Sequence, residues 1–167
     1  MGQSCFVLIA EGISPGLQSR RNMMSRFDVP KSSPKIFEAM LGLASSLEDN
    51  PQIPRVLRDL VECRVSQING CSHCLRMHSK SHADHGGDAI KVTMLAVWRA
   101  AKGYDEAERA ALDWAECLTE AVDQDRISQS YRNLVDHFEK DAISELTCII
   151  STMNAWNRLG IAQHEFA

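Results

Sequence analysis

Residues 62–78 read Glu-Cys-Arg-Val-Ser-Gln-Ile-Asn-Gly-Cys-Ser-His-Cys-Leu-Arg-Met-His, and this stretch carries both a sharp chain reversal and the reactive groups. Asn69-Gly70 is typical of a helix end, because glycine adopts the left-handed backbone conformation at low cost. Cys71 and Cys74 follow at once and lie one helical turn apart, close enough to form a disulfide with little rearrangement. The stretch therefore predicts two helices that meet at a redox-active thiol pair.

Apolar side chains recur at steps of three and four residues on both sides of this stretch, which indicates amphipathic helices. The predicted helices are Ser33 to about Leu47, Pro54 to Asn69, Ser72 to about His85, Asp88 to Trp98, Asp105 to Val122, a shorter one from Ser128, and Asp141 to about Leu159. The last helix is apolar on nearly all sides, so we expect it to be central. No alternation with period two is long enough for a strand. The predicted fold class is all-α, a bundle of about six to seven helices.

Composition restricts the possible functions. The chain has 167 residues, 44% apolar and 24% charged, which suits one soluble domain with a sizeable core. The formal net charge of -4 argues against a nucleic-acid partner, since phosphate binding requires a basic stripe. No stretch approaches the roughly 18 to 20 consecutive apolar residues that cross a bilayer. We therefore expect neither nucleic acid nor membrane among the partners.

The N-terminal part of the chain differs from the rest. Residues 1–23 contain scattered glycine and proline without sustained periodicity, which predicts a loosely structured arm ahead of a helical domain over residues 24–167. The apolar run Cys5 to Ala10 is too short for the core of a signal peptide, so we expect no export. Six cysteines in an unexported chain indicate reduced thiols with one special pair, and a cytoplasmic location.

Sulfur and imidazole groups share one face of the helix that begins behind Gly70. Steps of three and four residues, at about 100° per residue, place five side chains on one narrow stripe. These are Cys71, Cys74, His78, His82 and His85. Cys74 and His78 are four residues apart, the spacing at which side chains on adjacent turns meet. Glu62 or Asp59 on the preceding helix could orient this imidazole, which would complete a relay that activates a thiol.

Such a set of groups suffices for peroxide reduction. A thiolate attacks the peroxide oxygen and becomes a sulfenic acid, and a second thiol condenses with it to a disulfide. Cys71 lies at the helix start, where the macrodipole favours a thiolate, whereas Cys74 has His78 beside it. These physical arguments leave open which cysteine attacks.

The same residues resemble the AhpD-like alkylhydroperoxidases of the carboxymuconolactone decarboxylase superfamily, in an uncharacterised peroxidase-related branch. The likeness covers residues 24 to about 162 and rests on five motifs. They are Ser66-Gln-Ile-Asn-Gly-Cys-Ser-His-Cys74 with His78, Leu57-Arg-Asp-Leu-Val-Glu62, Trp98-Arg99, Glu108-Arg-Ala-Ala-Leu-Asp-Trp114 and Asn154-Ala-Trp-Asn-Arg-Leu159. The resemblance implies a cofactor-free, peroxiredoxin-type peroxidase with an antioxidant role.

The resemblance also implies the roles of the site residues. Cys74 corresponds to the cysteine that attacks the peroxide and Cys71 to the one that resolves the sulfenic acid. His78 and an upstream carboxylate correspond to the proton relay. In the better known enzymes this carboxylate lies twelve residues before the first cysteine, where the chain has Asp59, whereas Glu62 lies nine before it. We expect Glu62 to serve because of its longer reach, with Asp59 as the alternative.

Partners follow from the resemblance as well. The substrate is expected to be a hydroperoxide. The disulfide of Cys71 and Cys74 is expected to be reduced by a dithiol, such as a lipoyl group or a thioredoxin-like protein. The assembly is expected to be a homo-oligomer, either a trimer or a hexamer.

Alternative interpretations stand beside these. His78 and His82 could complete a zinc site with the two cysteines, although four ligands on one short helix are a poor geometry for structural zinc. The protein could instead be a disulfide reductase without peroxidase activity, or a non-redox relative of the decarboxylases. Ordinary structural roles are expected for several residues near the pair: Asp59 as a surface acid, His82 and His85 at the surface or helix end, Cys63, Cys117 and Cys148 in core packing, and Trp98, Trp114 and Trp156 in helix or subunit packing.

Overall fold

The computed structural model describes residues 25–49 and 51–164, and helices make up most of this part of the chain. They are α2 (Val29–Ser32), α3 (Pro34–Ser46), α4 (Arg55–Asn69), α5 (Ser72–Asp84), α6 (Ala89–Met94), α7 (Glu106–Glu120), α8 (Gln124–Leu134) and α9 (Lys140–Gln163), with a 3-10 turn η2 (Leu95–Val97) after α6. Within these residues the only β-type pairing is an isolated bridge between Ser25 and His164. The all-α prediction is confirmed, with one helix more in these residues than predicted, the short α2; the predicted helix from Asp88 to Trp98 divides into α6 and η2. The predicted arm, residues 1–23, lies outside the described part.

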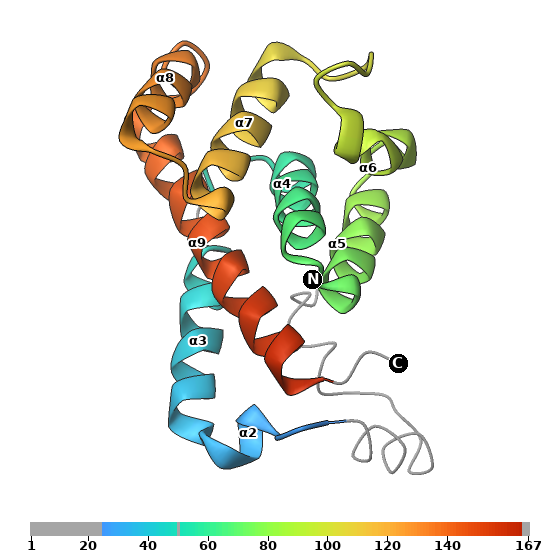
Figure 1. Cartoon of the computed structure of the whole chain (residues 1–167), viewed down its shortest axis with the longest axis vertical. Coiled ribbons are helices and arrows are strands. Elements are labelled where there is room, and N and C mark those ends of the chain that lie inside the picture. The colour runs from blue at the N-terminus through green and yellow to red at the C-terminus, as the bar shows by residue number, and fades with distance from the viewer. Residues whose placement is uncertain (1–24, 50, 165–167) are drawn as a thin grey trace.

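The reversal between α4 and α5 forms as the sequence predicts. Gly70 has a left-handed backbone, with φ of 76°, and its N–H donates to the carbonyl of Gln67 at 3.2 Å. Cys71 then caps α5, since its sulfur accepts from the backbone N–H of Cys74 at 3.4 Å. The two helices consequently lie side by side in the middle of the molecule (Figure 1).

The central helix is α4 rather than α9, which corrects the prediction. Helices α5, α7 and α9 all pack against α4, and nine of its fifteen residues are buried, charged ones included. Helix α9 runs diagonally across the molecule and buries only one side (Figure 1). Its other side exposes small residues at steps of three and four: Ser144, Cys148, Ser151 and Ala155. These exposed positions carry serine, cysteine and alanine, so α9 is apolar on one side only.

Two further predictions are wrong at the level of single residues. Helix α8 begins at Gln124, not Ser128, because the Asp123 carboxylate accepts from the Arg126 N–H at 2.9 Å and caps the helix four residues earlier. Among the three cysteines assigned to core packing, Cys63 and Cys117 are buried but Cys148 is exposed.

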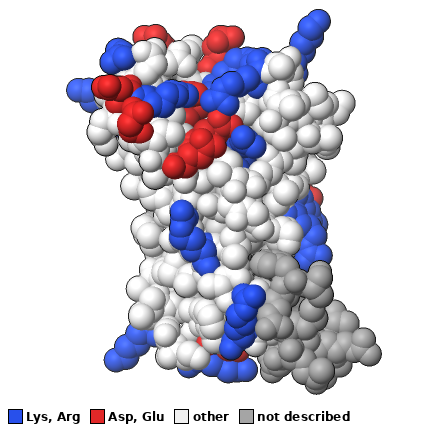
Figure 2. Space-filling view, viewed as in Figure 1, with Lys and Arg blue, Asp and Glu red and all other residues white. Residues whose placement is uncertain are grey.

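Charge is unevenly distributed over the surface. Charged side chains gather over α7 and α8, whereas the face along α3 and α9 is largely uncharged (Figure 2). At the charged end the Asp113 carboxylate pairs with both Arg99 and Arg126. No helix in the described part is long and apolar enough to span a membrane.

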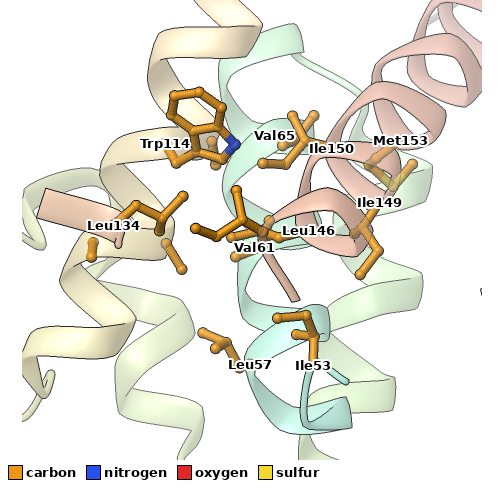
Figure 3. Close-up of a cluster of buried hydrophobic side chains, with 14 of the residues drawn as sticks. Ile53, Leu57, Val61, Val65, Trp114, Leu134, Leu146, Ile149, Ile150 and Met153 are labelled. Atoms are coloured by element: carbon orange, nitrogen blue, oxygen red, sulfur yellow. The ribbon is translucent and has the colours of Figure 1, made fainter. Parts of the chain in front are cut away.

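The main hydrophobic core lies where α4, α7, α8 and α9 meet (Figure 3). Val61 and Val65 of α4 contact Leu146 and Ile150 of α9, and Trp114 closes the cluster from α7. Cys71 and Cys74 belong to the same cluster of buried residues. The thiol pair is therefore fixed at the edge of the core, on rigid elements.

Candidate active site

Cys71 and Cys74 form a disulfide, with 5.4 Å between their Cα atoms. Both are almost fully buried, at 1% and 5% exposure. The bridge spans the first turn of α5, so the predicted pairing of these thiols is present in the structure. A disulfide at this position is directly compatible with thiol–disulfide exchange.

His78 lies one turn beyond Cys74 on the buried face of α5, and its Nδ1 is 2.8 Å from the Glu62 Oε2 of α4. The two groups make an ion-pair contact, although their alignment does not meet hydrogen-bond geometry. The His78 Nε2 has no hydrogen-bond partner among the described residues. One ring nitrogen thus faces a carboxylate and the other is open to a proton donor or acceptor.

Arginine side chains hold the carboxylates of α4 in place. The Arg58 Nε donates to the Glu62 Oε1 at 3.1 Å, and the Arg55 Nε donates to the Asp59 Oδ1 at 3.2 Å. Asp59 also accepts from the Ser81 hydroxyl at 2.9 Å, and it lies 3.8 Å from the His78 Nδ1. Asp59 is fully buried, so its assignment as a surface acid is wrong. Glu62 is the nearer carboxylate to the imidazole.

The charges in this cluster shift the pKa values of both partners. Burial alone would raise the pKa of Glu62, but the charge of His78 and then of Arg58 outweighs it and lowers this pKa to about 2. Burial would lower the pKa of His78, but the Glu62 carboxylate outweighs it and raises this pKa to about 9. With the disulfide closed, the pair therefore holds an imidazolium against a carboxylate at neutral pH.

The predicted stripe of five side chains divides in the structure. Cys71 and Cys74 are joined to each other, and His78 lies one turn beyond Cys74 on the buried side of α5, paired with Glu62. His82 is buried, not at the surface, and its Nδ1 lies 3.0 Å from the Val56 carbonyl oxygen. The ring packs against Gly87, where an added Cβ would fall 2.2 Å from the His82 Nε2. His85 is exposed, as predicted.

Cys63 is buried close to the same carboxylates but is not a second nucleophile. Burial raises the pKa of its thiol to about 12, and Asp59 and Glu62 add to the shift. A thiol with this pKa has almost no thiolate at neutral pH. Its interpretation as a core residue is supported.

An apolar cavity of about 140 Å³ opens onto the disulfide at Cys74. Its walls come from three separate parts of the chain: Val29, Pro30 and Phe37, then His73 and Met77 of α5, then Met153, Trp156, Leu159, Gly160, Gln163 and His164 at the end of the described chain. Phe37 and Trp156 meet edge to face, with ring centroids 5.8 Å apart. Helix spacing did not predict this cavity, because its walls are far apart in sequence.

The buried cluster also tests the metal alternatives. Asp59, Glu62 and His78 bring three possible ligand atoms within 4.8 Å of one another. Both carboxylates already face guanidinium groups, from Arg55 and Arg58, and these positive charges oppose a second cation. In the alternative zinc set the two cysteines are joined to each other, so their sulfurs are not available as thiolate ligands while the disulfide is closed. The residues present fit proton transfer better than metal binding.

Comparison with known proteins gives the family. A family model for the carboxymuconolactone decarboxylase family matches residues 34–116. YdfG, an uncharacterised protein of Bacillus subtilis (strain 168), is 28% identical over 140 residues, which cover 84% of this chain and 95% of YdfG. A solved structure from Agrobacterium tumefaciens, of a protein of unknown function suggested to be the antioxidant-defence protein AhpD, has a TM-score of 0.77 and 29% identity, over 86% of this chain and 99% of that one.

The debrominase Bmp8 has a similar fold, with a TM-score of 0.67 and 24% identity over 81% of this chain and 74% of its own. The chain belongs to the carboxymuconolactone decarboxylase superfamily, in its AhpD-like group. The family predicted from the sequence motifs is thereby confirmed, and it supports an antioxidant or peroxidase-related role at the level of the family.

Proposed function

We propose that this chain is a thiol-dependent hydroperoxide reductase with an antioxidant role, in which Cys74 attacks the peroxide and Cys71 resolves it. One observation carries the proposal: Cys74, joined to Cys71, lines an apolar cavity and is followed one helical turn later by the buried His78, which is paired with Glu62. Cys74 is the better nucleophile of the two, because it lines the cavity and precedes His78 by one turn.

The proposed reaction begins from the reduced pair. The Cys74 thiolate attacks the terminal oxygen of the hydroperoxide, the O–O bond breaks, and the leaving alkoxide takes a proton from the His78 imidazolium to become an alcohol. Cys74 is now a sulfenic acid. Cys71 attacks its sulfur, and the hydroxide that leaves combines with the Cys71 proton as water. An external dithiol then supplies two electrons and two protons and reopens the disulfide.

Glu62 and Arg58 have positioning roles in this scheme. Glu62 holds His78 protonated while the disulfide is closed, so the imidazolium can stabilise the Cys74 thiolate as soon as it is released. Arg58 bonds the other oxygen of Glu62 and keeps that carboxylate ionised and oriented. No cofactor enters the scheme.

Assembly and partners belong to the same proposal. Helix α3 has Ala44 as its one buried residue and exposes Ile36 at 62% and Leu43 at 50%. Apolar residues on a face with few charges support self-association, and we propose a trimer or a hexamer. Light scattering after gel filtration measures this directly. The lipoyl or thioredoxin-like reductant and the cytoplasmic location stay predictions.

Peroxide consumption with dithiothreitol as reductant tests the proposal. Cys74→Ser should abolish turnover. Cys71→Ser should still react once with peroxide and accumulate a sulfenic acid that dimedone traps. Cys148→Ser, on the exposed side of α9, is the matched control and should behave as the wild type. Full activity of the Cys74→Ser variant would exclude the proposed mechanism.

Two other functions compete with peroxide reduction. A disulfide relay would use the same two thiols, and a non-redox enzyme would use neither. A disulfide relay would exchange with protein disulfides, while its reduced form would react with peroxide no faster than a free thiol of equal thiolate fraction. A non-redox enzyme would keep its activity after both thiols are alkylated. A bromopyrrole should also be tested as a substrate, because a cysteine-to-alanine variant of Bmp8 was solved in complex with 2,3,4-tribromopyrrole. If the protein releases bromide from it and consumes no peroxide, the substrate is a haloaromatic compound and not a hydroperoxide.

A further inference from the structure

The segment Ser25–Pro30 crosses the C-terminal end of α9 and is held there by several hydrogen bonds. The backbone N–H of Arg26 donates to the Gln163 carbonyl at 2.8 Å. The Arg26 guanidinium donates to three more carbonyls, those of Ile161 at 3.3 Å, Ala162 at 3.2 Å and His164 at 3.1 Å. A cation on the last carbonyls of a helix satisfies groups that have no helical partner and favours the helix dipole. We call Ser25–Pro30 the strap.

The strap is also part of the cavity. The side-chain oxygen of Gln163 accepts from the Val29 N–H at 3.0 Å, which fixes Val29 against the end of α9. Val29 is buried, and Val29, Pro30 and Gln163 all line the cavity at Cys74. The hydrogen bonds of Arg26 and Gln163 therefore hold in place one wall of the space in which a reactant would meet the sulfur.

The last turns of α9, which the strap holds, lie directly against the disulfide. An added Cβ at Gly160 would lie 3.6 Å from the Cys71 sulfur and 3.9 Å from the Cys74 sulfur. Since both sulfurs are almost fully buried, a molecule that reaches Cys74 through the cavity contacts the strap and the end of α9 on its way.

The cavity offers about 140 Å³ beside Cys74, close to the volume of about 150 Å³ that holds a benzene molecule in an enclosed apolar cavity. A small branched alkyl group or a single ring therefore fits beside the sulfur, and a larger group would press on the strap or extend out of the open side. We infer that the strap is the size-selecting wall of this site, and that Arg26 and Gln163 determine how large an organic group can approach Cys74. That the reactant is a hydroperoxide rests on the proposed function, but the role of the strap as a wall beside Cys74 does not.

Releasing the strap tests the inference. The variants are Arg26→Ala, Gln163→Ala and the two combined, and the measurement is kcat/KM for hydrogen peroxide and for cumene hydroperoxide. The ratio of cumene hydroperoxide to hydrogen peroxide should rise about five- to tenfold in the combined variant and less in each single one. Arg158→Ala is the matched control, because Arg158 also donates to a carbonyl of α9, that of Asn154, but does not touch the strap. Its ratio should not change.

A second measurement separates the wall from the peroxidase chemistry. The reduced protein is treated with iodoacetamide or with the bulkier N-pyrenylmaleimide, and mass spectrometry follows alkylation of the peptide that contains Cys71 and Cys74. The released strap should raise the rate with the maleimide and leave the rate with iodoacetamide nearly unchanged. If this occurs without peroxide turnover, the size-selecting wall stands and the proposed function is wrong. If the combined variant consumes peroxide but keeps both the wild-type ratio of kcat/KM for the two peroxides and the wild-type ratio of the two alkylation rates, the strap does not select by size.

Discussion

The two sides of α5 differ in chemistry. Toward α4 lies a dry cluster of charges, in which His78 is held between carboxylates and each carboxylate is paired with an arginine. Toward the end of α9 lies a cavity lined mainly by apolar side chains and bounded on one side by Val29 and Pro30 of the strap. Cys74 belongs to both sides, since it lines the cavity and precedes His78 by four residues. In the proposed reaction, protons are handled on one side and the organic group is received on the other.

The largest effect is expected on the charged side. Glu62→Gln should lower the rate of peroxide reduction by about 100- to 1000-fold, because His78 loses the carboxylate that keeps it protonated and oriented. Stopped-flow oxidation of the reduced protein by tert-butyl hydroperoxide measures this. Asp59→Asn is the comparison, and its loss should be smaller because Asp59 lies 3.8 Å from the imidazole rather than 2.8 Å. Equal losses in the two variants would remove the distinction between the two carboxylates.

The same ion pair should control the pH dependence of stability of the oxidised protein. The pKa of Glu62 is lowered to about 2 from 4.5, so its contribution is complete above pH 4.5 and is lost as pH falls toward 2. The pKa of His78 is raised to about 9 from 6.5, so its contribution is complete below pH 6.5 and is lost as pH rises through 9. The pair should therefore stabilise the fold most between these limits.

Urea unfolding of the oxidised wild type and Glu62→Gln at several pH values measures this contribution. The variant should be less stable by about 3 kcal/mol near pH 6, because it leaves a buried imidazole without its charge partner. The difference should shrink above pH 9 and below pH 3. A difference that does not vary with pH would show that packing, and not charge, explains the loss.

Sequence patterns predicted the fold and the charged side well, for a physical reason. The α4–α5 reversal, the thiol pair and the nearness of His78 to Glu62 all depend on spacing within residues 59–78, and helical geometry converts spacing directly into position. Burial was harder to predict. Asp59 and His82 are polar residues on helix surfaces by pattern, yet inside the protein Arg55 and Ser81 bond Asp59, and the Val56 carbonyl lies against one ring nitrogen of His82.

The cavity side could not be predicted in the same way. Phe37 and Trp156 are 119 positions apart in the sequence, and the contact between them depends on how α3 packs beside α9. The strap depends on hydrogen bonds from Arg26 to backbone carbonyls, which carry no sequence signal at the accepting residues. Long-range packing therefore fixes the part of the site that selects the reactant.

Gly160 gives a matched pair of variants on the cavity side. An alanine Cβ there would lie at ordinary contact distance from the two sulfurs, so Gly160→Ala should retain most activity. The two methyl groups of valine extend further into the same space, so Gly160→Val should reduce kcat/KM for cumene hydroperoxide by about tenfold. Hydrogen peroxide should be affected less, because it needs less room. An equal loss for both peroxides would point to distortion of the disulfide rather than to a smaller cavity.

The smallest effect is expected at Met77, whose thioether lines the cavity from α5. Met77→Ala removes apolar contact to the organic group in the ground state and the transition state alike, so it should raise KM for cumene hydroperoxide about two- to threefold and leave kcat unchanged. Met94→Ala, at a partly exposed position of α6 outside the cavity lining, is the matched control and should change neither parameter. A fall in kcat for Met77→Ala, comparable to that of Glu62→Gln, would mean that the cavity side also takes part in proton transfer and that the two sides of α5 are not separate.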